Sequence, residues 1–221
     1  MATRAGYFFK PFVLLPLCLS LLLPGCQTAY YSTMEKFGVH KRDILIDRVE
    51  EARDSQQEAK EQFASALEKF SSVVKFKGGE LEKQYQQLKN ELARCEAGAE
   101  QVHERIKAVE EVAEDLFDEW QDELEQYTGS KLRQSSKNKL ARTKKQYAGL
   151  IKAMKRAEAK IEPVLNPMRD QVLYLKHNLN ARAIASLENE LTTIETDVAR
   201  LIREMESSIR EADAFIRDME K

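Results

Sequence analysis

Glycine and proline, the residues that most often form tight turns, are scarce in this chain of 221 residues. It has eight glycines and five prolines, and three of the prolines lie within the first 25 residues. Sandwiches, barrels and βα repeats depend on many tight connections, so this scarcity excludes them. The composition therefore predicts an all-α protein, whose helix pattern must decide how it is organised.

One long apolar run lies near the N-terminus, from Pro11 to Leu23, behind the basic residues Arg4 and Lys10. A membrane-spanning helix needs roughly 18 or more apolar residues, whereas this run is shorter and is interrupted by Pro16. The pattern is typical of a secretion signal instead. We predict a signal peptide over residues 1–25.

The tetrapeptide Leu23-Pro24-Gly25-Cys26 resembles a bacterial lipobox, in which the cysteine receives a diacylglycerol before the signal is cut off. Pro24 departs from the small residue usual at its position. The alternative is ordinary cleavage, which needs small residues one and three before the cut, and Gln27-Thr28-Ala29 supplies only one of them. We predict lipidation of Cys26, with residues 26–34 as a tether.

Gln27 stands directly after this cysteine, where aspartate is the usual signal for retention in the inner membrane. The lipoprotein resemblance therefore implies a protein anchored in the outer membrane of a Gram-negative bacterium, on the periplasmic face. Cys18 leaves with the signal and Cys26 is acylated, so Cys95 is the one free thiol. No internal disulfide is expected in this oxidising compartment.

Apolar residues recur at alternating steps of four and three along residues 35–221, the spacing of helices that meet along a narrow seam. Four runs carry this pattern, over residues 45–73, 81–127, 140–179 and 184–219, and Gln56 is a polar interruption of the first. Turns are expected at Gly78-Gly79 and at Gly129, and Asn180 is placed to cap the last helix. We predict an elongated antiparallel, coiled-coil-like bundle of four long helices. The seam aromatics expected in its core are Phe63, Phe70, Tyr85, Trp120 and Tyr147.

The third run contains Pro163 and Pro167, each of which lacks an N–H and clashes with the preceding turn. One option ends the third helix at Pro163. The other carries it, kinked at the two prolines, to the segment 177–180. We prefer the second option because it gives four helices that pair off without leaving a seam uncovered.

Charge divides into two blocks on either side of Gly129. Residues 100–125 are strongly acidic, and residues 131–160 are strongly basic with Glu158 as their one acid. Folding the chain back at Gly129 lays the blocks side by side, which favours mutual neutralisation and a fixed register. The functional alternative is a site for anionic lipid or another polyanion. It would use Lys137, Lys144, Lys145, Lys152, Lys155 and Arg156.

Motifs for chemistry are weak throughout the chain. Glu100 and His103 form an E-x-x-H step, but a di-iron bundle needs a second such step, and neither His40 nor His177 provides it. Gly129-Ser130-Lys131 follows a helix rather than a strand, so it is a turn and not a phosphate-binding loop. Cys95 occupies a seam position. We expect no catalytic residue, metal, cofactor, small-molecule substrate or nucleic acid partner.

Three segments resemble those of an uncharacterised family of proteobacterial lipoproteins, known as a domain of unknown function. They are M-E-K-F-G-V-H-K-R-D-I-L at 34–45, F-K-G-G-E-L at 76–81 and V-L-Y-L-K-H-N-L-N-A-R-A-I at 172–184. The resemblance spans nearly the whole mature chain. It implies a helical fold and a place in the cell envelope, and it implies no activity.

The function expected from these features is that of a structural spacer, scaffold or adaptor in the cell envelope. Its partner would be an unidentified envelope protein or a second copy of the chain. With four alternating helices, the turns near residues 78 and 178 share one end, away from the turn at Gly129. We therefore predict the partner contact at that distal tip, through Phe76, Lys77, His177 and Asn178.

Overall fold

The computed structural model describes residues 40–75, 81–178 and 180–221, and no residue in these ranges forms a strand. The chain divides into two units, Met1–Gly38 and Val39–Lys221, and all the described residues belong to the second. Cys26, the signal peptide and the tether lie outside the described residues. The protein is all-α, as the sequence predicts. Its elements are α2 (Lys41–Val74), α3 (Leu81–Glu123), the short 3-10 helix η1 (Leu124–Gln126), α4 (Ser130–Glu158), α5 (Ile161–His177) and α6 (Ala181–Met219).

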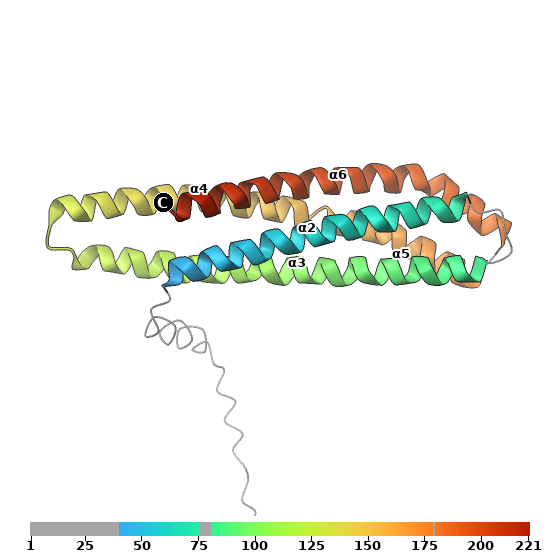
Figure 1. Ribbon diagram of the computed structural model, residues 1–221, viewed down its shortest axis with the longest axis horizontal. Coiled ribbons are helices and arrows are strands. Elements are labelled where there is room, and N and C mark those ends of the chain that lie inside the picture. The colour runs from blue at the N-terminus through green and yellow to red at the C-terminus, as the bar shows by residue number, and fades with distance from the viewer. Residues whose placement is uncertain (1–39, 76–80, 179) are drawn as a thin grey trace, which may run out of the picture. The chain divides into compact units, whose positions relative to one another are not determined.

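The helices lie side by side along most of their length (Figure 1). Helix α2 packs against α3 and α6, and α6 also packs against α4 and α5. Helix α3 completes the ring of contacts by packing against α4 and α5. None of the helices in the described ranges has the length and apolar composition needed to cross a membrane.

The core follows the predicted heptad seams closely. Every seam position of α2 is buried, including Phe63 and Phe70, and so is the interrupting Gln56. Tyr85 of α3 is buried as well, whereas Trp120 and Tyr147 are half-buried. A helix that buries one side chain at every third or fourth residue presents a continuous apolar stripe to its neighbours, and this stripe stabilises it far more than propensity does.

The third predicted helix is two helices in the structure, because α4 ends at Glu158 and α5 begins at Ile161. Pro163 has no N–H to give to the carbonyl of Ala159, and its ring disfavours a continuous helix there. The last turn of α4 closes upstream instead: the Ala159 N–H donates to Lys155 at 3.0 Å and the Lys160 N–H to Ala157 at 3.0 Å. Pro163 then falls in the first turn of α5, where no intrahelical donor is needed. Pro167 remains inside α5.

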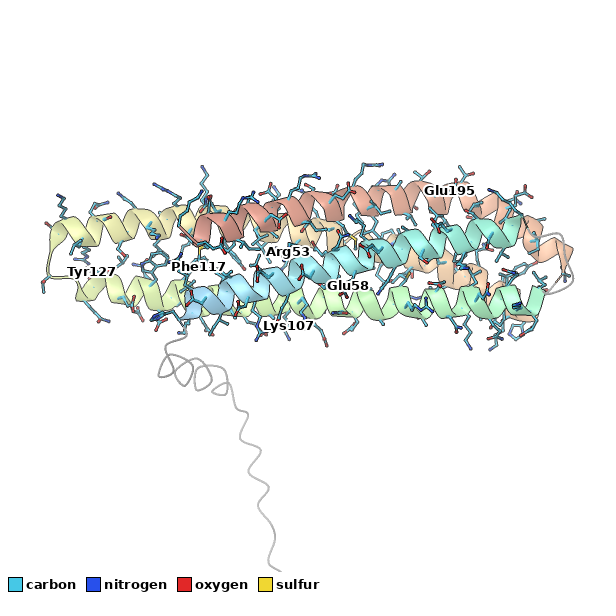
Figure 2. All side chains as sticks on the ribbon, in the orientation of Figure 1. Arg53, Glu58, Lys107, Phe117, Tyr127 and Glu195 are labelled. Carbon is cyan, nitrogen blue, oxygen red and sulfur yellow. The ribbon has the colours of Figure 1, made fainter. Side chains whose placement is uncertain are left out.

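The segment 124–145 extends beyond the ends of α2 and α6. Lys41 at the start of α2 lies 3.2 Å from Glu119 of α3. Asp218, near the end of α6, accepts a hydrogen bond from Gln146 of α4. Beyond these contacts α3, η1 and α4 continue as a pair, joined at the turn that holds Tyr127 (Figures 1 and 2). We call this segment the two-helix extension.

Candidate functional site: a charged cleft at the α4–α5 junction

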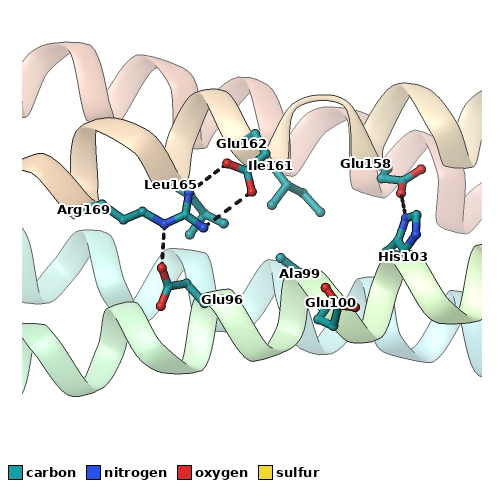
Figure 3. Close-up of a pocket in the computed structure, with 9 residues that line it drawn as sticks. All are labelled: Glu96, Ala99, Glu100, His103, Glu158, Ile161, Glu162, Leu165 and Arg169. Carbon is teal, nitrogen blue, oxygen red and sulfur yellow. Dashed lines mark hydrogen bonds and ion pairs between the residues drawn. The ribbon is translucent and has the colours of Figure 1, made fainter.

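A cleft of about 500 Å³ opens between α3 and the junction of α4 with α5 (Figure 3). The junction at Ala159 and Lys160 interrupts the regular helix between Glu158 and Ile161, both of which line the cleft. Ala99, Ile161 and Leu165 supply its apolar lining. Its polar side chains are Glu96, Glu100, His103, Glu158, Glu162 and Arg169. The cleft is therefore rich in carboxylates, with two basic groups set among them.

His103 and Glu158 form one pair across the cleft. The Nδ1 atom of His103 lies 2.6 Å from Oε1 of Glu158, linking α3 to the last residue of α4. The hydrogen bond to this carboxylate, followed by its charge, raises the pKa of His103 above its usual value. Glu100, the other half of the E-x-x-H step, adds a smaller effect of the same sign.

Arg169 forms the second cluster on the α5 side of the cleft. Its Nε atom donates to Glu96 of α3 at 2.5 Å, and Nη1 donates to Glu162 at 2.8 Å and to Asn166 at 3.0 Å. The hydrogen bonds to the two carboxylates raise the pKa of Arg169 further above its usual value. The guanidinium remains charged under all ordinary conditions and does not give up a proton. The cluster therefore joins α3 to α5 through ion pairs and takes no part in proton transfer.

The chemistry available to the cleft is that of ion pairing. No group of three or more metal-binding side chains occurs among the described residues, so the carboxylates of the cleft do not converge on a common point. Cys95, the described thiol, is fully buried on the α3 seam. Burial raises its pKa to about 12, and the thiolate needed for nucleophilic attack is therefore not formed at neutral pH.

The predicted basic strip lies exposed on α4, but its six members differ in their surroundings. Lys155 pairs with Glu110 at 2.5 Å and Arg156 with Glu204 at 3.3 Å. Lys144 lies over the ring of Phe117, 5.5 Å from its centroid. The remaining three, Lys137, Lys145 and Lys152, form no ion pair with any residue in the described ranges.

The residues predicted for the distal tip are only partly described. Phe76 and Lys77 lie outside the described residues, as does the Gly78-Gly79 turn. His177 is exposed at the end of α5. Asn178 donates from Nδ2 to the carbonyl of Tyr174 at 3.0 Å, so its side chain satisfies one of the free carbonyls at the end of α5. The structure thus brings His177 and Asn178 together at one helix end.

Contacts of α3 and η1 with the two following helices run in a regular order. Along the series, the residue numbers on the α3 side decrease while the residue numbers of their partners in α4 and α5 increase. In that order the pairs are Glu125–Arg133, Trp120–Ser136, Phe117–Tyr147, Glu110–Lys155, His103–Glu158 and Glu96–Arg169. The two partners that line the cleft, Glu158 and Arg169, were not predicted as site residues. Glu158 carried a signal, since it is the one acid of the basic block.

These features describe an all-α protein with a charged surface cleft. Its sequence matches a family described as protein of unknown function, DUF2959, over residues 30–219, and the chain belongs to that family. No curated protein and no solved structure matches the chain.

Proposed function

We propose that the protein is a lipoprotein anchored in the outer membrane through Cys26, and that its helical unit serves as a spacer, scaffold or adaptor in the periplasm. The observation that carries this proposal is a continuous packed seam, because seam residues of α2, α3, α4, α5 and α6 are buried. Burial of this kind gives a stiff body with long exposed edges, which suits a structural role.

The finer architecture proposed is an antiparallel, coiled-coil-like bundle in which α4 and α5 together act as the third long helix. The ordered pairs between α3 and these two helices support an antiparallel arrangement. The pairs Arg53–Asp213 and Lys60–Glu206 support it for α2 and α6 in the same way. At 1.5 Å per residue, the 43 residues of α3 give a body about 65 Å long.

Metabolic labelling with a palmitate analogue tests the anchor. The wild-type chain should incorporate the label and fractionate with the outer membrane, whereas Cys26→Ala should lose both properties because no other cysteine follows the signal closely. Cys95→Ala is the matched control and should label normally. Equal labelling of wild type and Cys26→Ala would contradict the proposal.

A second candidate function is binding of an anionic membrane surface through the basic strip. The observation in its favour is that Lys137, Lys145 and Lys152 are exposed and have no ion partner among the described residues. Co-sedimentation of residues 39–221 with vesicles of anionic or neutral lipid tests it. Binding that requires anionic lipid and falls with added salt would support this function, and binding that depends on neither would exclude it.

A further inference from the structure

We propose that two copies of this chain associate through the outer face formed by α3 and α4, with the acidic strip of each copy against the basic strip of the other. This inference rests on the proposed role as a scaffold and names its partner and its surface. The acidic strip is defined as Glu104, Glu114, Asp118 and Asp122 of α3. Of the basic strip of α4, the members that face it are Lys137, Lys145 and Lys152, because Lys144, Lys155 and Arg156 already contact Phe117, Glu110 and Glu204.

The acidic strip is exposed and lacks local compensation. All four of its carboxylates are exposed, and none forms an ion pair within the described part of the chain. Glu104 and Asp118 fall midway between seam positions of α3, so they point directly away from the core. Glu114, Asp118 and Asp122 follow one another at a spacing of four residues, so their like charges repel, and a cationic surface from outside would relieve the repulsion.

Lys137, Lys145 and Lys152 have the same character on α4, since each is exposed and forms no ion pair within the described part of the chain. Residues 130–157 contain no acid at all. Lys145 lies midway between the seam positions Thr143 and Tyr147, and Lys152 lies midway between Leu150 and Met154, so both also point away from the core. The structure thus pairs the two blocks only in part: α3 and α4 meet along their flanks, and Glu104, Asp118, Lys145 and Lys152 point outward without an ion pair among the described residues.

Contacts within the helical unit leave this outer face open. Arg105 and Glu119 of α3 reach across to Glu51 and Lys41 of α2, on one flank of α3. Arg156 and Gln146 of α4 reach across to Glu204 and Asp218 of α6, on the far flank of α4. The α3–α4 face lies away from both of these neighbours, since α2 and α6 close the ring of helices on the other side.

A twofold axis parallel to the helices brings two such faces together. It places α3 of one copy against α4 of the other, and the same pairing then occurs a second time by symmetry. The two copies run in the same direction, as anchoring in one membrane would require. The charged blocks match in length, because both are measured from the same turn at Gly129.

An anionic membrane fits this face less well than a second copy does. Packed helices lie 8–10 Å apart, which is close to the screening length of about 8 Å at physiological salt. A uniformly negative surface that approaches the basic strip therefore also meets the acidic strip. A second copy offers charges of both signs in the required positions, and so satisfies both strips together.

Charge reversal of the full chain provides the test. The first variant is Lys137→Glu, Lys145→Glu and Lys152→Glu, and the second is Glu114→Lys, Asp118→Lys and Asp122→Lys. Two differently tagged copies are coexpressed and co-purified from mild detergent at low salt. We expect the wild type to co-purify with itself and each variant to lose at least about tenfold of that self-association. Mixing the two variants should restore association, because opposite charges then face each other again.

Reversal of exposed acids on α6, as Glu188→Lys, Glu190→Lys and Glu195→Lys, is the matched control and should leave self-association unchanged. Circular dichroism confirms that each variant is folded. Failure of the wild type to self-associate, or failure of the mixed variants to recover, would overturn the inference. Gain of anionic-vesicle binding by the second variant, without recovery in the mixture, would show an anionic surface as the partner. Palmitate labelling at Cys26 is measured in a separate experiment. The lipid anchor and the self-association can therefore each be contradicted without the other.

Discussion

Gln56 and Ser208 are polar side chains in positions where the seam is otherwise apolar. Both are fully buried, and both amide atoms of Gln56 and the hydroxyl of Ser208 lack a hydrogen-bond partner within the described part of the chain. The contact between Arg53 and Asp213, three residues from Gln56 and five from Ser208, places the two at nearby levels of the α2–α6 interface. A buried polar group of this kind opposes stability and favours one register of pairing over others.

Replacement of Gln56 by leucine should therefore stabilise the helical unit. Leucine has a similar volume and removes the desolvation cost of the unpaired amide, so the free energy of unfolding should rise by about 1–2 kcal/mol. Urea denaturation of residues 39–221 measures this change. Gln57→Leu is the control, because Gln57 donates to Glu61 on the surface at 2.6 Å and should change stability little. A loss of stability in Gln56→Leu would show that the amide is satisfied in solution.

His103 offers a prediction about pH. Its pKa is raised chiefly by the hydrogen bond to Glu158, so the pair contributes its stability below the unfolded value of about 6.5 and loses it as pH rises through the higher folded value. The imidazole is well exposed, which makes its resonance a good reporter while keeping the energetic effect small. Titration by NMR should show the pKa of His103 falling in Glu158→Gln. In Glu100→Gln it should fall less, and equal effects would contradict the assigned cause.

At the scale of the helix, glycine positions differ in what a side chain would meet. Gly149 lies inside α4 with open space where a Cβ would stand, whereas a Cβ at Gly98 of α3 would collide with the side chain of Gln62. Gly149→Ala should raise the free energy of unfolding by about 0.5–1 kcal/mol, through helix propensity. Gly98→Ala should gain less or lose stability, because Gln62 must move. Urea denaturation of both variants compares them, and an equal gain would contradict this distinction.

The helices and their buried faces were predictable because heptad spacing is a local property of the sequence. Phe63, Phe70 and Cys95 lie in the core for this reason. The junction between α4 and α5 was placed too far along the chain, since the prolines act on the turn before them and not at their own positions. The pair of His103 with Glu158 was missed because it depends on the register between two helices, which spacing within one helix does not contain.

At the scale of the whole molecule, the small net charge of −2 conceals a separation of charge between neighbouring helices. The sequence alone showed two opposite blocks, and mutual neutralisation was one reasonable interpretation. Among the described residues, the ion pairs across the interface join flanking residues such as Lys155 and Glu110. Separation of this kind makes the molecule sensitive to ionic strength even though its net charge is nearly zero.

The two-helix extension should unfold locally more easily than the rest of the helical unit. Residues 124–145 share their apolar contacts between two helices, whereas the body shares them among a full ring, so fewer contacts must break to free their amides. Hydrogen exchange followed by mass spectrometry should therefore find the fastest exchange around Tyr127 and Leu132 and the slowest in the middle of α2. A protease should cut first at Arg133 for the same reason, and the two fragments should stay together because α4 still packs against α3 and α6.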